Sequence, residues 1–150
     1  MRDFLKSIYF FKSFNAEELQ LVEKICESVK FGADQTLFKE NDEASAMFFV
    51  TIGRVRIRKG TDESDIVQIG QGGIFGEVPF LDGGTRSATA TTVEETHLIK
   101  IPYSRLMMTL VAHQDLSIKF YEVAAKFMAK RLRSTTEDLK AAKEFLYKHF

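Results

Sequence analysis

Glycine is distributed unevenly along the chain, and this distribution constrains the fold more than any other feature. All nine glycines lie between Gly32 and Gly84, so that the first 31 residues and the last 66 contain none. Glycine marks turns and backbone conformations that other residues avoid. We therefore expect a helical start over about 1–30, a turn-rich middle over 31–103 and a helical end over 104–150. The total length suits a single domain.

Short strands are predicted in the middle region by the spacing of its apolar residues. In MFFVTIGRVRIRKG, residues 47–60, the last part alternates arginine with valine and isoleucine, which is the two-residue period of a half-buried strand. Residues 64–73 and 88–101 also fit strands, and several short strands at this spacing predict a sandwich, roll or barrel. We interpret the alternating arginines as a solvated face, because long charged side chains normally face water; they are Arg54, Arg56 and Arg58.

Helices are indicated on both sides of the middle region. Asn15 is a suitable N-cap, and Glu18 three residues later completes a capping-box pattern for a helix over residues 15–28. Residues 104–112 fit a short helix. Residues 115–149 contain neither glycine nor proline and fit one long helix or two with a bend.

The last part of the chain carries an apolar seam at coiled-coil spacing. Its residues follow steps of four and three: Met128, Leu132, Thr135, Leu139, Ala142 and Leu146. A seam of this length is short for a coiled coil and also suits a helix packed on its own domain. A helix of about 35 residues would be about 50 Å long, more than a domain of this size needs, so we favour a homodimer through this helix.

Composition and charge disfavour several classes of protein. Lysine plus arginine and aspartate plus glutamate number 21 each, so the chain lacks the basic excess of a nucleic-acid-binding domain. No stretch suits a membrane span or the core of a signal peptide, and we expect a cytoplasmic protein. The single cysteine, Cys26, cannot form an internal disulfide and is interpreted as a small buried side chain. His97, His113 and His149 lack metal-ligand spacing, so no metal site is predicted.

One loop, FGEVPFLDGGTRSATA over residues 75–90, is the candidate binding site. Gly76 would let a ligand approach the backbone, Pro79 would begin a short helix, and Arg86 would offer a rigid fork to a phosphate. Glu77 would then need a donor of its own, which a ribose hydroxyl would supply. The residues alone leave an alternative open, because LDGG also suits a tight turn and the two charged residues could form an exposed ion pair worth about 0–1 kcal/mol.

This loop resembles the phosphate-binding cassette of cyclic nucleotide-binding domains. The cassette pattern is Phe-Gly-Glu with an aliphatic residue and, after a short loop, Arg-Ser/Thr-Ala. This sequence matches it at Phe75, Gly76, Glu77, Val78, Arg86, Ser87 and Ala88. The strand FFVTIGRVRI is similar as well, so the resemblance covers almost the whole chain from about Phe11. It implies an α+β fold, namely an eight-stranded antiparallel β-roll, jelly-roll-like, flanked by N-terminal helices and a long C-terminal helix.

The resemblance also implies a role for each cassette residue. Glu77 would accept a hydrogen bond from the ribose 2′-hydroxyl, Arg86 would pair with the cyclic phosphate, and Ser87 would touch that phosphate. Gly76 and Val78 would supply the backbone around the ribose. The implied ligand is cyclic AMP or cyclic GMP, with no catalytic group and no metal, and Ser87 leaves the choice of base open.

The end of the chain is similar to the catabolite activator protein-like branch of that family. MAKRLRSTTEDL, residues 128–139, resembles the start of the long dimerisation helix of that branch. Thr135 and Thr136 match positions whose hydroxyls reach the base, the second from the partner subunit, and this pair favours cyclic AMP. The alternative for them is a polar seam position and a solvated neighbour. A helix-turn-helix domain follows this helix in transcription factors of the branch, whereas this sequence ends at Phe150, so we expect no nucleic-acid binding by this chain alone.

Pro79 departs from the cassette pattern. The family has a small residue there whose backbone N–H can donate to the phosphate, and proline has no N–H. One hydrogen bond to a charged group contributes about 1.5–3 kcal/mol. We therefore expect an affinity about tenfold lower or more, rather than loss of binding.

Three functions remain as hypotheses. We favour a non-catalytic regulatory module that binds a cyclic mononucleotide and signals through its C-terminal helix to an unidentified effector. A scaffold that keeps the fold, binds no ligand and acts through protein contacts is the alternative. An enzyme on a related β-roll, such as a metal-dependent cupin, would need clustered histidines and carboxylates, and here the histidines are scattered.

Overall fold

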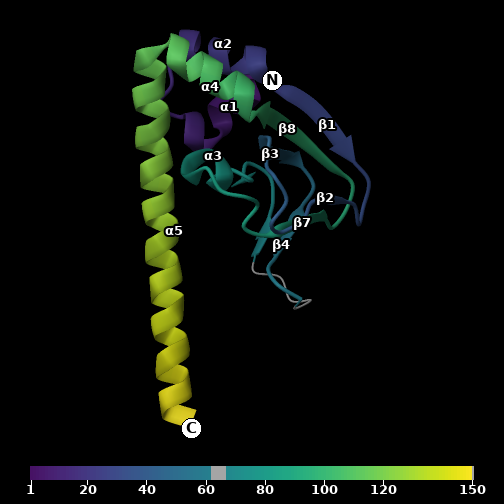
Figure 1. The fold of residues 1–150 in the computed structure, drawn as a ribbon, viewed down its shortest axis with the longest axis vertical. Helices are drawn as coiled ribbons and strands as arrows, with labels where there is room; N and C mark the ends of the chain where they lie inside the picture. Colours follow the sequence, from purple (N-terminus) through teal and green to yellow (C-terminus); the bar gives the residue numbers. More distant parts are fainter. Residues whose placement is uncertain (62–66, 150) are drawn as a thin grey trace. The chain divides into compact units, whose positions relative to one another are not determined.

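Short alternating segments fold the middle of the chain into two antiparallel sheets of four strands each (Figure 1). The computed structural model describes residues 1–61 and 67–149. Within them the strands are β1 (Glu27–Phe31), β2 (Thr36–Phe38), β3 (Ala46–Ile52), β4 (Val55–Arg58), β5 (Val67–Ile69), β6 (Ile74–Phe75), β7 (Thr89–Thr92) and β8 (Thr96–Pro102). One sheet has the order β1-β8-β3-β6 and the other β2-β7-β4-β5. The predicted α+β fold with its antiparallel β-roll is confirmed.

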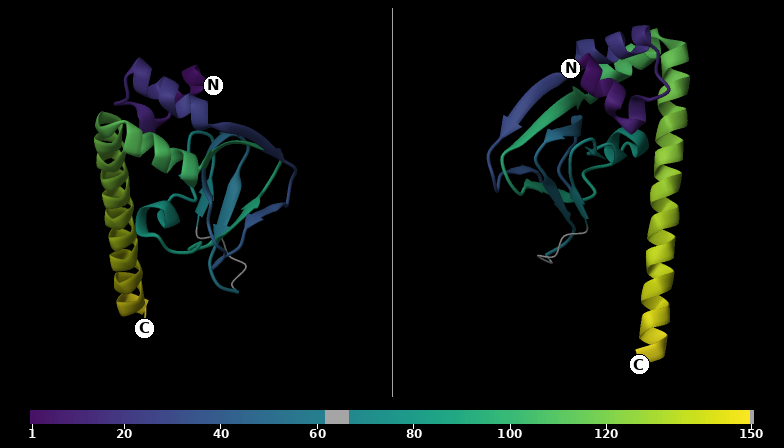
Figure 2. Two further views of the ribbon diagram at one scale, coloured as in Figure 1. Left: turned by 45° about the horizontal axis from the view of Figure 1, so that its top comes forward. Right: turned by 180° about the vertical axis from the view of Figure 1, so that it is seen from behind.

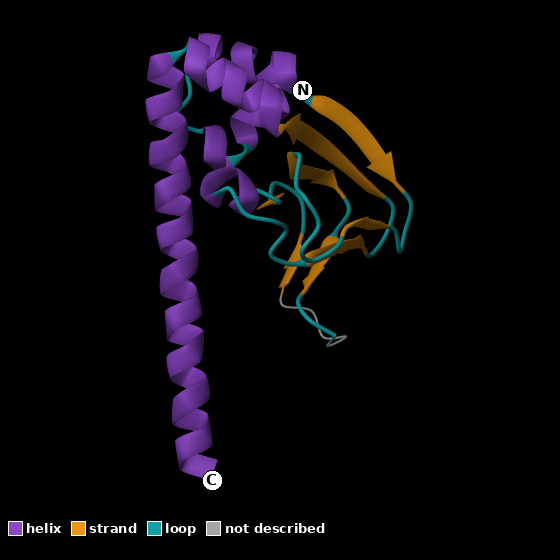
Figure 3. Cartoon of the chain, in the orientation of Figure 1, coloured by secondary structure: helices purple, strands orange, loops and turns teal. Residues whose placement is uncertain are grey.

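The helices lie at the two ends of the sequence, with one short exception inside the cassette (Figure 3). They are α1 (Arg2–Ser7), the 3-10 turn η1 (Tyr9–Phe11), α2 (Ala16–Ile25), α3 (Val78–Asp82), α4 (Tyr103–Ala112) and α5 (Gln114–His149). Helix α2 packs against α4, and Figure 2 shows these two helices together from two further sides. None of the helices in the described part of the chain has the length and apolar character of a membrane span.

Helix α2 begins as the sequence predicts and ends earlier. Asn15 Oδ1 accepts from the backbone N–H of Glu18 at 2.9 Å, and Glu18 Oε1 accepts from the N–H of Asn15 at 2.9 Å, so the capping box is complete. The helix ends at Ile25 rather than at residue 28, because Cys26 is already extended. From Glu27 on, the chain pairs with β8, and this sheet pairing overrides the helical pattern.

Strand β3 is buried on both faces, and this burial places the core. Phe48 and Val50 point into the roll, where they pack with Val55 of β4 and Leu98 of β8. Phe49 points to the opposite side, where its ring centroid lies 6.1 Å from that of Phe10 and 5.1 Å from that of Phe11. The strand is therefore covered by the second sheet on one side and by the N-terminal segment on the other.

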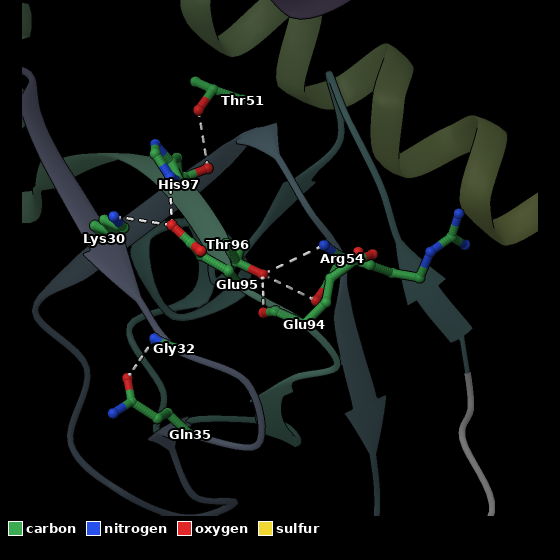
Figure 4. A network of polar contacts seen from close by, with 9 residues as sticks. All are labelled: Lys30, Gly32, Gln35, Thr51, Arg54, Glu94, Glu95, Thr96 and His97. Atoms are coloured by element: carbon green, nitrogen blue, oxygen red, sulfur yellow. Dashed lines mark hydrogen bonds and ion pairs between the residues drawn. The ribbon is translucent and has the colours of Figure 1, made fainter.

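Strand β4 shows the alternation that its sequence predicts. Val55 is fully buried and Ile57 packs against the core, whereas Arg54 is exposed. Arg56 and Arg58 are half-buried, so the predicted solvated face holds only in part, because both lie beside strand β7. The start of β4 is fixed by the buried Thr96, whose Oγ1 accepts from the backbone N–H of Arg54 at 3.3 Å and donates to the Glu94 carbonyl at 2.8 Å (Figure 4).

The chain divides into two compact units, and the second begins at His113. The first, Met1–Ala112, contains both sheets, the cassette and the helices up to α4. The second consists of α5, a single helix of 36 residues, so that of the two arrangements considered for the end region the unbroken helix is correct. The single domain over 1–150 stays a prediction.

Candidate functional site

Two backbone hydrogen bonds hold Arg86 in place independently of its side chain. The N–H of Arg86 donates to the Asp42 carbonyl at 2.8 Å, and the N–H of Asn41 donates to the Arg86 carbonyl at 2.8 Å. Asn41 adopts a left-handed conformation with φ 73°, which an asparagine tolerates better than most residues. The cassette is thereby tied to the turn that precedes β3.

The side chain of Arg86 is buried, with only 5% of the residue exposed. Nη2 donates to the Ala46 carbonyl at 2.7 Å and Nη1 donates to the Gly76 carbonyl at 3.0 Å. The guanidinium carbon lies 3.9 Å from the ring centroid of Phe38, so the cation rests on an aromatic face. Nε is buried and has no hydrogen-bond partner among the residues that the structure describes.

Tyr103, the first residue of α4, completes the surroundings of this guanidinium. Its hydroxyl accepts from Arg86 Nη1 at 3.3 Å and donates to the Gly76 carbonyl. Its ring centroid lies 5.3 Å from that of Phe80 in α3. Tyr103 therefore contacts both ends of the cassette, although it lies outside the cassette in the sequence.

Glu77 is buried as well, with 4% of the residue exposed. Its carbonyl accepts from the N–H groups of Phe80 at 3.1 Å and Leu81 at 3.3 Å, so helix α3 begins at Val78. The predicted short helix is present, but its start precedes Pro79 by one residue, because the Glu77 carbonyl makes the first helical contacts. The burial of Glu77 and Arg86 contradicts the alternative of an exposed ion pair.

The Arg86 guanidinium and the Tyr103 hydroxyl both keep the protons that their hydrogen bonds require. Burial lowers the pKa of the Arg86 guanidinium, and Tyr103, Asp42 and Glu77 oppose that shift. An arginine remains charged at neutral pH even so. Burial raises the pKa of the Tyr103 phenol, so the hydroxyl keeps the proton that it donates.

Gly76 occupies a position that other residues would not fit. Its φ is +78°, and a Cβ added there would lie 2.8 Å from Arg86 Nη1 and 3.3 Å from the Ala46 carbonyl oxygen. The sequence predicted that Gly76 lets a ligand approach the backbone. In the structure, the absence of a side chain at Gly76 first makes room for the guanidinium of Arg86.

The predicted site residues fall into two groups in the structure. Gly76, Glu77 and Arg86 are brought together, with Val78 half-buried next to them and Ser87 exposed. Thr135 and Thr136 lie on α5, both exposed, and the Thr136 hydroxyl donates to the Leu132 carbonyl at 2.8 Å.

Sequence reasoning missed three residues that hold the arginine: Phe38, Ala46 and Tyr103. Phe38 and Ala46 precede the cassette and Tyr103 follows it, and no periodicity or motif in the sequence links them to Arg86. A signal for Tyr103 would have been its place between a predicted strand and a predicted helix, where the chain changes direction.

The surroundings of His97 do not suit a metal ion. His97 Nε2 lies 3.4 Å from Glu95 Oε1, and the same carboxylate oxygen lies 2.8 Å from Lys30 Nζ, all three side chains being exposed (Figure 4). The lysine ammonium lowers the pKa of Glu95 and would repel a cation. No group of three or more potential metal ligands occurs in ranges 1–61 and 67–149.

A family model now identifies this fold and cassette. The model of the cyclic nucleotide-binding domain matches residues 28–113, which are more than half of the chain. The chain belongs to the cyclic nucleotide-binding domain family. The matched region contains the whole cassette together with Tyr103, so the predicted family is confirmed.

Individual relatives agree with this assignment. Lysophospholipase nte1 of Neurospora crassa is 30% identical over 115 residues, which are 75% of this chain and 7% of that protein. The Cyclic AMP receptor protein of Thermus thermophilus is 29% identical over 143 residues, 90% of this chain and 62% of that protein. The solved Catabolite Activator Protein of Thermus thermophilus has a TM-score of 0.76 at 26% identity, over 89% of this chain and 62% of that one. The chain spans less than two thirds of each of these three proteins.

Proposed function

We propose that this chain is a non-catalytic regulatory module that binds a cyclic mononucleotide in its 75–90 cassette, cyclic AMP in preference to cyclic GMP. The observation that carries the proposal is the buried guanidinium of Arg86, whose Nε has no hydrogen-bond partner among the described residues. A buried cation is costly unless it is paired, and a cyclic phosphate would supply an acceptor of opposite charge.

The neighbouring Glu77 narrows the chemistry of the ligand. A free inorganic phosphate would be repelled by this carboxylate, whereas a ribose hydroxyl would donate to it. The two buried groups together therefore fit a sugar phosphate better than a simple anion. Among the relatives, the Thermus thermophilus protein is named a Cyclic AMP receptor protein. The preference for cyclic AMP rests on Thr135 and Thr136, which match base-contacting positions of that branch.

We propose further that the signal leaves through α5 and that α5 joins two copies of the chain. The ligand would change the fraction of molecules in which α5 takes each of its positions. It can do so only if it binds more tightly to the protein with α5 in one position than in another. Three leucines of the predicted seam are exposed in the single chain, which supports a partner along it. They are Leu132, Leu139 and Leu146.

The proposal is tested by calorimetric titration of ligand-stripped protein with cyclic AMP and, in parallel, cyclic GMP. We expect the wild type to bind cyclic AMP and Arg86→Ala to bind it at least about thirtyfold more weakly, since loss of one partner of a buried charge pair costs about 2–5 kcal/mol. Arg54→Ala removes an exposed arginine outside the cassette and is the matched control. Equal binding by wild type and Arg86→Ala would contradict the site.

The presence of Pro79 favours a second candidate function, namely a scaffold that has kept the fold but binds no nucleotide. This residue is buried within α3 and offers no N–H to a phosphate. Absence of heat with either nucleotide would favour the scaffold. Restoration of binding by Pro79→Ala would then identify the missing N–H as the reason.

A further inference from the structure

Tyr103 occupies a junction between the cassette, strand β3 and helix α4. Its backbone N–H donates to the Ser45 carbonyl at 2.8 Å, and the next carbonyl along the chain, that of Ala46, accepts from Arg86 Nη2. The start of α4 is thus hydrogen-bonded to Ser45, and the cassette arginine is hydrogen-bonded to the next residue, Ala46.

The hydroxyl of Tyr103 adds a second connection to the same arginine. It accepts from Arg86 Nη1 and donates to the Gly76 carbonyl, which itself accepts from Nη1 at 3.0 Å. Three groups therefore close a small ring of hydrogen bonds around one end of the guanidinium. The aromatic side chain of Tyr103 is held in place by its contact with that of Phe80.

These contacts fix the direction in which the Nε–H of Arg86 points. A guanidinium is planar and has five N–H donors in a rigid fork. Nη1 is engaged by Gly76 and Tyr103 and Nη2 by Ala46, so the orientation of the whole group is set. Nε, buried and without a hydrogen-bond partner in the described part of the chain, is then held in one direction.

We propose that Tyr103 is a positioning residue for the anion site: its hydroxyl holds the Arg86 guanidinium in the orientation that receives the ligand phosphate. This inference rests on the proposed function and deepens it. A preorganised side chain loses less conformational freedom on binding, and the ligand is therefore bound more tightly. Because Tyr103 is also the first residue of α4, the same contact ties the state of the site to that helix.

Tyr103→Phe isolates the hydroxyl. The variant keeps the ring against Phe80, and the Gly76 carbonyl still accepts from Arg86 Nη1, so no buried carbonyl loses its only partner and the protein is expected to fold. We expect cyclic AMP to bind about three- to tenfold more weakly, the range of one hydrogen bond. Tyr9→Phe, which alters an exposed tyrosine of the same unit, is the control and should bind as the wild type does.

A double-mutant cycle separates positioning from a purely structural role. Calorimetric titration with cyclic AMP is carried out on the wild type, Tyr103→Phe, Arg86→Lys and the double variant. Because the hydroxyl acts through the guanidinium, we expect the effect of Tyr103→Phe to shrink in the Arg86→Lys background. Additive effects would overturn the inference.

The binding data distinguish failure of the inference from failure of the proposed function. Binding by the wild type with equal or tighter binding by Tyr103→Phe would overturn the positioning role and leave the nucleotide site intact. No binding by the wild type would overturn both. Weaker binding by Tyr103→Phe together with a non-additive cycle supports the inference.

Discussion

At the residue scale, the cassette is organised around one buried cation with several kinds of partner. Arg86 contacts two backbone carbonyls, a phenol hydroxyl and an aromatic face, and a buried carboxylate lies close enough to influence its pKa. Among the described residues, none of the groups that hydrogen-bond it carries a negative charge. This is the arrangement that we expect of an arginine that receives an anion.

Gly76→Ala tests how closely the cassette backbone and Arg86 fit together. We expect a loss of stability of about 1–2 kcal/mol from the left-handed backbone, and a further loss because the new Cβ would lie 2.8 Å from Arg86 Nη1. Gly72→Ala is the matched control, since Gly72 has φ +82° and nothing lies within 4 Å of its added Cβ. Urea unfolding compares the two variants; equal losses would show that the arginine moves aside without cost.

Cys26 is predicted to react slowly with alkylating reagents. Burial, with Glu23 as a second cause, raises the pKa of its thiol to about 12, and Sγ donates to the Val22 carbonyl. Because the thiol pKa is higher in the folded protein than in the unfolded chain, the protonated thiol favours the folded state. This stabilisation is complete below the unfolded pKa of about 8.5 and is lost as pH rises toward the pKa of the folded protein. We expect iodoacetamide labelling at pH 8 to be much slower in the native protein than in urea. Labelling at equal rates would contradict the partial burial of Cys26.

At the element scale, α5 is a continuous helix whose final part exposes apolar residues. Leu132, Leu139 and Leu146 are each more than half exposed, and they recur every seven residues within the seam predicted from the sequence. A helix of 36 residues is about 54 Å long. Such a seam is expected to pair with a second copy of itself, and the homodimer remains a prediction.

Leu139→Glu is expected to convert the dimer into a monomer. Leu139 is 55% exposed in the single chain, so the change should leave folding intact while it places a charge in the seam. Light scattering over a range of concentrations would show the halved mass. Ala141→Glu puts the same charge on an exposed position outside the seam and should remain dimeric. A monomeric wild type at high concentration would remove the proposed dimer.

At the scale of the whole molecule, strand β3 joins the two layers of packing. One face contributes Phe48 and Val50 to the interior of the roll, and the other contributes Phe49 to the N-terminal aromatic cluster with Phe10 and Phe11. The N-terminal segment is therefore part of the folded roll rather than an appendage.

Phe49→Ala is expected to destabilise the protein by about 3–5 kcal/mol, the usual cost of emptying a fully buried aromatic position. Ile52→Ala, on the same strand but 59% exposed, should change stability by no more than about 0.5 kcal/mol. Denaturant unfolding of both variants checks the difference. Similar effects at the two positions would show that the N-terminal segment contributes little packing.

The sequence alone determined the features that depend on neighbours a few residues apart. The Asn15 capping box, the alternation in β4, the helical character of the end region and the cassette motif all follow from short local patterns. Hydrogen bonds and side-chain periodicity within one element produce such patterns, and they therefore remain readable without a fold.

Tertiary structure alone decided how the cassette is held. Ala46, the cassette residues Gly76 and Arg86, and Tyr103 come from three separate segments. Only the pairing of β3 with β8 brings Tyr103 beside the residues that anchor the arginine. The early end of α2 has the same origin, because pairing of Glu27 with Lys100 competes with the local helical pattern. Contacts of this kind depend on strand register and burial, which no short stretch of sequence encodes.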